Sequence, residues 1–350
     1  MQARIASARS ILENAVRPLF LFDDDADGLC SFLILYKLVN SGRGMAVKAR
    51  PTVEPMFLRK VTEYDPDLVV VLDKSGISEE FIDRCNVPIL WVDHHEPQDY
   101  IPKEKITFVN PLEHGLEPYP TCYWAYQIAG APDESLWLVA TGCVGDWQII
   151  PDVHERCIES FPSFCPEGKG GAPDYLFDAP IGTLVKIFML NLKGKSSDVY
   201  KSIKTLTRIK GPDEILQQQT PAGRFIYSRY SKLIGEYNQL LERVSDAATG
   251  DRLLLFIYND VSTSMTSFLS NEVLYRFPRK VTLIARKSNG EYKCSLRCSP
   301  PMSLKDIMAS IIPSVDGYGG GHDQAVGACI QEHDFEKFVE LLREEIKNDE

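Results

Sequence analysis

Three acidic clusters in the first hundred residues are the strongest candidates for chemistry. They are the run from Asp23 to Asp27 in DDDADG, Asp73, and Asp93 with His94 and His95. Each cluster follows a short apolar run (LFLF, LVVVL or ILWV) that predicts a buried strand. Since ligands of an open α/β sheet collect beyond the carboxyl ends of its strands, the clusters should converge there. Carboxylates with imidazole suit a divalent cation such as Mn²⁺, or two cations if a carboxylate bridges them.

Each cluster also has a structural explanation when it is taken alone. An acidic run is usually a solvated loop, and an Asp after a strand, such as Asp73, often caps the next helix. His94 and His95 could be one surface and one buried histidine. The coincidence of all three clusters at successive strand ends is what favours a single site.

The segments around these residues predict an α/β fold with two lobes. From residue 18 to about 150, strands alternate with helices, which implies a mostly parallel, Rossmann-like sheet covered on both faces. Helical periodicity continues from about 181 to 247, and the last hundred residues predict a smaller domain with a mixed sheet. We therefore expect an N-terminal domain at 1–180, a helical connector at 181–248 and a C-terminal domain at 249–350.

Composition limits the possible classes of function. The 350 residues are 44% hydrophobic and 25% charged, which is typical of a soluble globular protein. No apolar run approaches the roughly 18 residues that span a bilayer, and Glu13 and Asn14 interrupt any signal-peptide core. Nine cysteines without a CxxC pair predict reduced thiols and a cytoplasmic protein. The net charge of −11 argues against a protein that holds long nucleic acid through global positive charge.

Two features of the C-terminal hundred residues could contact phosphate. The sequence GYGGGH at 317–322 predicts a flexible loop whose backbone could approach an anion, although a tight turn is the simpler explanation. Arg297 stands on a predicted strand, where its planar guanidinium suits bidentate phosphate binding. A surface ion pair is the commoner role of such an arginine. Before it, Asn289 and Gly290 predict a hairpin turn.

The motifs together resemble the DHH-family phosphoesterases that carry a DHH-associated C-terminal domain. That group includes RecJ-like exonucleases, oligoribonucleases, pAp phosphatases and cyclic-dinucleotide phosphodiesterases. DDDADG, Asp73, the Asp93-His94-His95 run and GCVGD ending at Asp146 match four family motifs in order. GGGH at 319–322 matches the hallmark of the associated domain.

The resemblance implies a site with two Mn²⁺ or Mg²⁺ ions and a separate set of substrate contacts. The implied metal ligands are Asp23 and Asp25 for one ion, Asp27, His94 and Asp146 for the other, and Asp73 as a bridge. The implied substrate contacts are His95 on the scissile phosphate and Arg297, Gly320, Gly321 and His322 at the far end of the substrate. Two cations would activate water and offset the charge of an in-line displacement.

The chain departs from the family pattern at three places. Lys74 and Ser75 intervene before Gly76, and an ammonium beside a cation site would be repelled unless it points at substrate phosphate. Asp24 adds a carboxylate that we expect to face away. Asp323 follows GGGH, and its charge could weaken the binding of an end phosphate.

The expected function is hydrolysis of phosphoester bonds in short single-stranded RNA or DNA by a metal-dependent exonuclease or phosphodiesterase. One alternative is a phosphohydrolase of pAp, cyclic dinucleotides or polyphosphate. Another is a non-catalytic nucleic-acid-binding subunit, against which the intact carboxylates argue. We expect no membrane partner and a possible homodimer.

Overall fold

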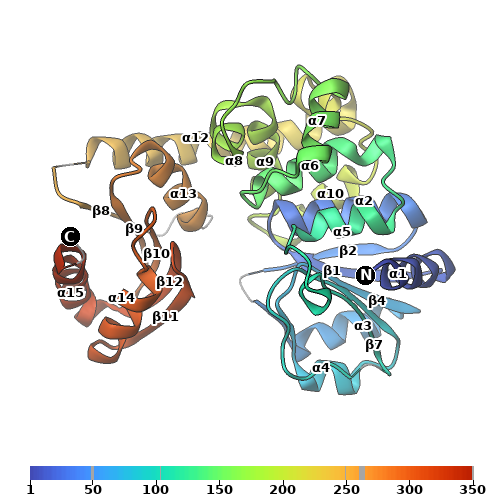
Figure 1. The fold of residues 1–350 in the computed structure, drawn as a ribbon, viewed down its shortest axis with the longest axis horizontal. Coiled ribbons are helices and arrows are strands. Elements are labelled where there is room, and N and C mark those ends of the chain that lie inside the picture. The colour runs from blue at the N-terminus through green and yellow to red at the C-terminus, as the bar shows by residue number, and fades with distance from the viewer. Residues whose placement is uncertain (49–50, 103, 249, 260–264, 349–350) are drawn as a thin grey trace. The chain divides into compact units, whose positions relative to one another are not determined.

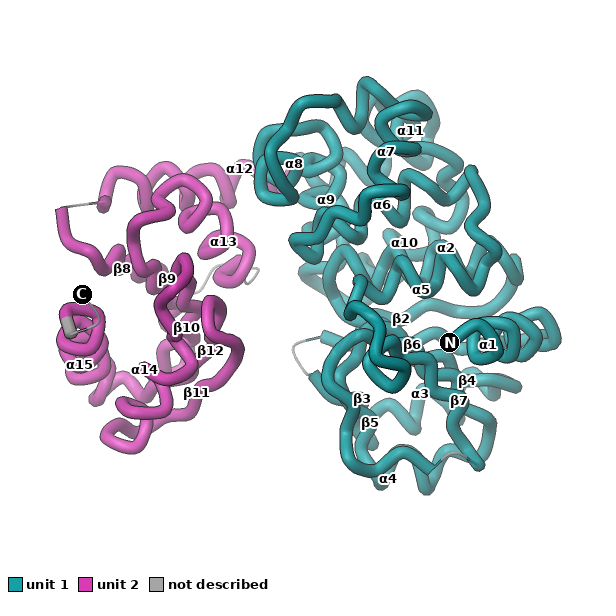
Figure 2. Tube along the Cα trace, viewed as in Figure 1, with its two compact units in different colours: residues 1–231 teal, residues 232–350 magenta. Residues whose placement is uncertain are grey.

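The computed structural model describes residues 1–48, 51–102, 104–248, 250–259 and 265–348. The chain divides into two compact units, Met1–Ser231 and Lys232–Glu350 (Figure 2). No helix among the described residues is long and apolar enough to cross a bilayer. All nine cysteines are described, and each is a free thiol.

A five-stranded parallel sheet is the frame of unit 1 (Figure 1). Its spatial order is β2-β1-β4-β6-β7, and every neighbouring pair is parallel. The strands are β1 (Pro18–Asp23), β2 (Arg43–Val47), β4 (Leu68–Leu72), β6 (Ile89–Val92) and β7 (Ile106–Val109). The three central strands are buried along almost their whole length, as expected where both faces of a parallel sheet are covered.

Helices cover both faces of this sheet. On one face, Phe32 of α2 (Ala26–Val39) packs against Phe20 and Phe22, with ring centroids 5.3 and 4.9 Å apart. On the other face, Val61 and Phe81 join the buried cluster of the strands. The other helices that precede β7 in the chain are α1 (Gln2–Asn14), η1 (Pro55–Phe57), α3 (Leu58–Tyr64) and α4 (Glu79–Arg84). Two further strands, β3 (Thr52–Val53) and β5 (Gly76–Ile77), form a short parallel pair of their own.

Helices also make up the rest of unit 1. They are η2 (Leu112–His114), α5 (Thr121–Ile128), η3 (Asp133–Ser135), α6 (Leu136–Gly145), α7 (Pro151–Ser160), α8 (Ala172–Asp178), α9 (Pro180–Asn191), α10 (Ser196–Leu206) and α11 (Pro212–Leu216). The 26-residue helix α12 (Pro221–Asp246) passes from unit 1 into unit 2. The predicted connector is therefore helical in large part, while its bounds of 181–248 stay a prediction.

Unit 2 contains a mixed five-stranded sheet, which confirms the predicted fold class. The order is β11-β12-β10-β9-β8, with β8 and β9 parallel and the other pairs antiparallel. Asn289 and Gly290, at φ of 53° and 80°, form the predicted turn between β9 and β10. Its elements are β8 (Leu253–Asn259), α13 (Thr266–Arg276), β9 (Val281–Ser288), β10 (Glu291–Arg297), α14 (Leu304–Ile311), η4 (Ile312–Ser314), β11 (Gly317–His322), β12 (Ala325–Gln331), η5 (Glu332–Asp334) and α15 (Phe335–Asn348).

The glycine-rich segment corrects one expectation. Residues 317–322 form the edge strand β11 instead of a flexible loop, because their backbone pairs along its whole length with β12. A Cβ at Gly317 would lie 2.5 Å from the carbonyl oxygen of Cys329, and one at Gly319 would lie 2.9 Å from Met308. Glycine therefore permits close approach between strands at these positions.

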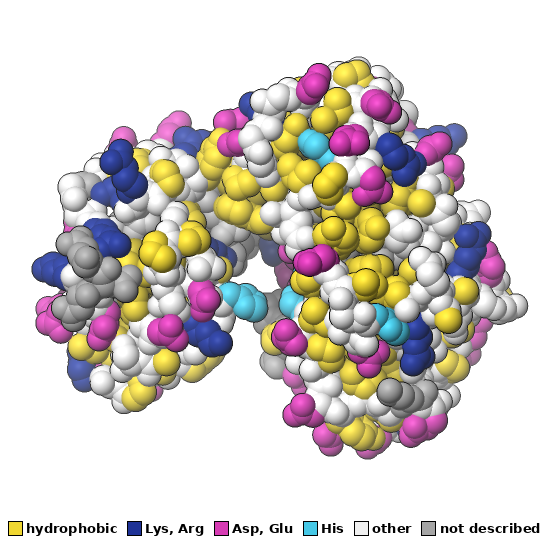
Figure 3. Space-filling model, viewed as in Figure 1, with side chains coloured by type: hydrophobic (Ala, Val, Ile, Leu, Met, Phe, Trp, Pro, Cys, Tyr) yellow, Lys and Arg dark blue, Asp and Glu magenta, His cyan; other side chains and the backbone are white. Residues whose placement is uncertain are grey.

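Acidic and basic side chains are interspersed on the visible face of each unit (Figure 3). The net charge of −11 is thus not concentrated in a single acidic patch on that face.

Candidate metal centre

The carboxyl ends of three neighbouring strands deliver acidic residues to one edge of the parallel sheet. Asp23 ends β1, Asp73 follows β4 and Asp93 follows β6. Asp73 has a left-handed backbone with φ of 57°, a conformation that Asp and Asn adopt more readily than other non-glycine residues. Its amide donates to the carbonyl oxygen of Val92 at 3.0 Å, and its side chain is buried. The turn therefore aims Asp73 into the edge where the strands end.

The first turn of α2 adds two more carboxylates. Asp25 is the N-cap of this helix and accepts a hydrogen bond from the amide of Gly28 at 2.9 Å. A Cβ at Gly28 would lie 2.7 Å from the backbone of Asp23, so glycine lets the helix begin against the end of β1. Buried Asp27 accepts hydrogen bonds from the amides of Thr121 and Cys122, both at 2.7 Å. These donors belong to the first turn of α5, where a negative charge is stabilised.

His94 is oriented by its contact with a carbonyl group. Its Nδ1 lies 3.2 Å from the carbonyl oxygen of Pro118, so Nδ1 carries the proton and donates. This tautomer leaves Nε2 as the atom that can ligate a metal. Nε2 lies 3.5 Å from Asp73 Oδ1 and 4.0 Å from Oδ2 of Asp146, which caps the carboxyl end of α6.

His95 is held by the fully buried Asp93. Its ring Nδ1 lies 2.9 Å from Asp93 Oδ1, and its amide donates to Oδ2 at 3.0 Å. Burial alone would lower the pKa of His95, but the hydrogen bond and charge of Asp93, with Asp146 and Asp27, raise it to about 9. The ring is therefore cationic at neutral pH, with Nε2 directed away from Asp93.

Three sets of side chains offer ligand atoms that lie within 4.8 Å of one another. Asp73 belongs to two of the sets, and His94 also belongs to two. The sets are Asp23 with Asp25 and Asp73, Asp27 with His94 and Asp146, and Asp73 with His94 and His95. Carboxylate oxygens with imidazole nitrogens match the ligand preferences of Mn²⁺, and the carboxylates alone suit Mg²⁺. These residues therefore fit a divalent cation.

The electrostatics of the cluster favour bound cations. Burial, followed by the charges of Asp23 and Asp27, raises the pKa of Asp25 to about 8. Burial and neighbouring carboxylates likewise raise the pKa values of Asp73 and Asp146 well above the ordinary range. A bound cation reverses this situation because it favours the ionised carboxylates.

Lys74 contacts the cluster directly, and sequence reasoning did not identify this contact. Its buried Nζ donates to Asp23 Oδ1 at 2.8 Å, and the amide of Asp24 donates to the same oxygen at 2.8 Å. The ammonium is therefore aimed at a carboxylate of the cluster. The Asp24 carboxylate pairs with Lys193 at 2.7 Å and belongs to none of the three ligand sets.

Two family models match the chain. One describes the DHH family, N-terminal domain, and covers residues 19–142; the other describes the DHHA1 domain and covers residues 250–348. The first contains all of the cluster described above except Asp146. The chain belongs to the DHH family of phosphoesterases.

Solved structures of similar fold cover nearly the whole of this DHH protein. The exonuclease RecJ bound to manganese is 16% identical with a TM-score of 0.66, and the match covers 97% of this chain and 93% of that one. RecJ from Thermus thermophilus with Mn²⁺ is also 16% identical with a TM-score of 0.66; the match covers 99% of this chain but only 55% of that one. A pGpG-specific phosphodiesterase from Vibrio cholerae is 15% identical with a TM-score of 0.51, covering 96% and 100%. At these identities the likeness establishes the fold. No curated protein matches the sequence.

The residues expected to hold the far end of the substrate all lie in the DHHA1 domain. Arg297 on β10 and His322 on β11 both stand opposite Ala325 of β12, so the three residues form one row across the sheet. Arg297 Nε donates to Asn271 Oδ1 at 2.6 Å, and no described carboxylate pairs with this guanidinium. Burial lowers the pKa of Arg297 to about 10, which leaves it charged at neutral pH.

Gly320 and Gly321, which directly precede His322 in this DHHA1 domain, differ in their surroundings. A Cβ at Gly320 would meet nothing within 4 Å, whereas one at Gly321 would lie 2.3 Å from the carbonyl oxygen of Ala325. Both residues are exposed.

Sequence reasoning on this DHH chain also missed the side chains that support the predicted ligands. Thr121 donates from its hydroxyl to Asp73 Oδ1 at 3.1 Å, and its amide holds Asp27. Thr121 lies 48 residues from Asp73 along the chain, and no local pattern relates the two. The two residues meet only in the folded chain, where the start of α5 lies beside the end of β4.

Proposed function

We propose that this protein is a metal-dependent phosphodiesterase that removes nucleotides from short single-stranded oligonucleotides with two bound cations. The observation that carries the proposal is that Asp73, which shares a ligand set with Asp23 and Asp25, lies 3.5 Å from Nε2 of His94, which shares a set with Asp27 and Asp146. A shared carboxylate suits a pair of cations close together, and such a pair stabilises both the attacking and the leaving oxygen of an in-line displacement.

In this proposal the metal ligands divide between two positions. Asp23 and Asp25 would hold one cation, Asp27, His94 and Asp146 would hold the other, and Asp73 would be a ligand shared by both. Bound Mn²⁺ or Mg²⁺ would supply an activated water and neutralise charge on phosphate oxygens. Lys74 and the amide of Asp24 fix Oδ1 of Asp23, which leaves Oδ2 to ligate. Such supporting contacts commonly set the geometry of a metal ligand.

His95 acts on the substrate in this proposal. With Asp93 on Nδ1, its second ring N–H is available to a phosphate oxygen. A cationic imidazole that is fixed before the reaction stabilises the negative charge on the phosphate oxygens in the transition state, at no further cost in orientation.

The DHHA1 domain supplies recognition in this proposal. Arg297, Gly320, Gly321 and His322 would bind the far end of the substrate, as a phosphate or a base. The charged guanidinium of Arg297, which lacks a described carboxylate partner, supports an anionic ligand.

A substrate panel tests the proposal. The protein is incubated with Mn²⁺ and end-labelled dinucleotides, longer RNA and DNA, pAp, cyclic di-AMP, linear pGpG and polyphosphate. We expect mononucleotide release from the single-stranded oligonucleotides. If hydrolysis is confined to pAp, to a cyclic or linear dinucleotide, or to polyphosphate, that compound is the substrate and the oligonucleotide proposal is wrong. If no member of the panel is hydrolysed, the proposed activity itself is wrong.

A further inference from the structure

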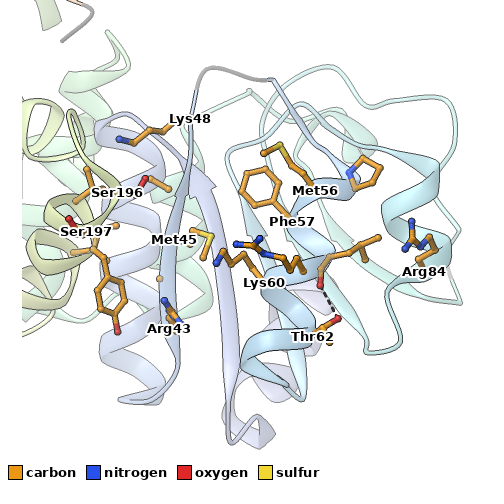
Figure 4. A pocket seen from close by; sticks show the side chains of 18 residues that line it. Arg43, Met45, Lys48, Met56, Phe57, Lys60, Thr62, Arg84, Ser196 and Ser197 are labelled. Atoms are coloured by element: carbon orange, nitrogen blue, oxygen red, sulfur yellow. Dashed lines mark hydrogen bonds between the residues drawn. The ribbon is translucent and has the colours of Figure 1, made fainter. Parts of the chain in front are cut away.

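A large groove lies along the free edge of the catalytic sheet and is not part of the metal centre. It has a volume of about 1140 Å³ and lies wholly within unit 1. Its floor is β2, which is the terminal strand of the sheet. Figure 4 shows Ser196 and Ser197 of α10 on one side, Met56 and Phe57 on the other, and Arg43 and Lys60 between them.

The charged side chains that line this groove are cationic. Among the described residues, five cationic side chains line it and no carboxylate does: Arg43, Lys48, Arg59, Lys60 and Arg84. Beside the groove, Glu63 pairs with Arg59 and Lys60, and Glu80 pairs with Arg84. Arg43 and Lys48 have no described carboxylate partner, so in a chain whose net charge is −11 they favour an anionic ligand at this place.

Arg43 is the strongest anchor in the groove. Its guanidinium lies 4.8 Å from the centre of the Tyr200 ring and 5.9 Å from that of Tyr64, which fixes its plane by cation–π contact. No described carboxylate pairs with it, and its buried Nε has no hydrogen-bond partner. A fixed guanidinium with donors to spare is well suited to a phosphate.

The lining also offers flat and apolar contacts. Tyr200 is 40% exposed, Met56 is 67% exposed, and Phe57 is partly exposed beside it. Cations alternating with aromatic side chains are typical of surfaces that bind single-stranded nucleic acid, because the cations follow the backbone and the rings stack on bases.

The groove begins beside the metal centre. β2 runs parallel to β1, and its last residue, Val47, stands opposite Asp23. Lys48 follows directly, and its Nζ donates to the carbonyl oxygen of Gly194 at 3.0 Å. One end of the groove therefore lies at the edge of the sheet where the carboxylates gather.

We propose that this groove binds the sugar–phosphate backbone of a single-stranded oligonucleotide, as a track that leads to or from the metal centre. The proposal rests on the proposed function and extends it, since such a track favours strands several nucleotides long over dinucleotides. An anionic peptide that pairs with the free edge of β2 is the competing occupant, and the test separates the two.

Binding without cleavage provides that test. Fluorescence anisotropy in EDTA measures the affinity of full-length protein for labelled single-stranded RNA and DNA dodecamers, a dinucleotide and a polyglutamate peptide across a salt series. In the double variant Arg43→Gln with Lys60→Gln we expect about tenfold weaker dodecamer binding. The slope of log affinity against log salt should fall by about 0.7 for each lost phosphate contact. Dinucleotide binding should not change.

Matched variants control for charge and folding. Arg9→Gln with Arg156→Gln removes two cations from α1 and α7 of the same unit, outside the groove, and should leave dodecamer binding unchanged. Because Arg43 packs against two rings, Lys48→Gln provides a second groove variant, and melting temperatures verify folding in every case.

Equal losses in both double variants would overturn the proposal, as would dodecamer binding that is absent in wild type. Stronger binding of polyglutamate than of the dodecamers, lost in the groove variant, would assign the groove to a peptide instead. Since no turnover is measured, these outcomes are independent of whether the substrate panel detects hydrolysis.

Discussion

At the scale of single residues, Asp73 is the position on which the proposed metal centre would depend most. It belongs to two of the three ligand sets, accepts a hydrogen bond from Thr121 and has a left-handed backbone. Replacement by alanine would confuse two effects, because a left-handed conformation costs residues other than glycine, Asn and Asp about 1–2 kcal/mol. Asparagine keeps both the shape and the backbone preference while it removes the charge.

We therefore predict that Asp73→Asn weakens Mn²⁺ binding at least about 10- to 100-fold, since even supporting contacts to a ligand have effects of that size. Isothermal titration calorimetry on metal-free protein measures affinity and number of sites, with two sites expected in wild type. The melting temperature of the metal-free variant should not fall. Unchanged Mn²⁺ affinity and stoichiometry would remove Asp73 from the bridging position.

The sequence predicts which acidic residues gather at this site better than it predicts their supporting contacts. Asp23, Asp73 and His94 follow apolar runs, so their convergence is a consequence of parallel strands. Lys74 could not be assigned, because the direction of a long side chain after a strand depends on tertiary packing. Its neighbour Trp91 shows this dependence, since the indole N–H donates to the carbonyl oxygen of Lys74 at 2.9 Å.

At the scale of elements, β11 is the part of the fold that the sequence predicted least well. Four of its six residues are glycine, which is disfavoured in strands and typical of loops. The strand forms because glycine allows its backbone to approach β12 and α14 closely, which is a property of the partners and not of the segment. The parallel strands of unit 1, in contrast, are apolar runs whose identity is evident locally.

We predict that two glycine-to-alanine changes in β11 separate folding from recognition. Gly317→Ala places a methyl group 2.5 Å from the Cys329 carbonyl oxygen, so it should destabilise unit 2 by about 1–3 kcal/mol. Gly320→Ala meets no atom within 4 Å and should change stability by less than about 1 kcal/mol.

Urea denaturation followed by circular dichroism gives both free energies of unfolding. If Gly320 contacts substrate as proposed, Gly320→Ala also raises KM for an oligonucleotide. A stable Gly317→Ala protein would contradict the close approach of β11 and β12, and an unaltered KM in Gly320→Ala would exclude Gly320 from the substrate site.

At the scale of the whole molecule, the acidic cluster links stability to pH and to metal. In the folded, metal-free protein Asp25 holds its proton up to a pKa of about 8, against an ordinary value of 3.8. The folded state thus binds more protons than the unfolded state between these values, and stability must fall as pH rises through that window.

We predict that the melting temperature in EDTA declines from about pH 4 to pH 8, because the free energy of unfolding falls by up to about 1.4 kcal/mol per pH unit for each such proton. Saturating Mn²⁺ should raise the melting temperature at neutral pH and flatten this decline, because a cation that binds only the folded state stabilises it. Asp25→Asn should flatten the metal-free profile in the same way. If the melting temperature in EDTA instead rises with pH, the pKa values of these carboxylates are not raised in the folded protein.

The central claim is that the acidic cluster of unit 1 hydrolyses phosphodiester bonds with bound metal. Its most direct test is the rate of mononucleotide release from a labelled single-stranded oligonucleotide as Mn²⁺ is added to metal-free protein. We predict no release in EDTA, a rate that saturates with Mn²⁺, and at least about a 100-fold lower rate for Asp73→Asn at the same Mn²⁺ concentration. Release that persists in EDTA, or that is equal in wild type and Asp73→Asn, would contradict the claim.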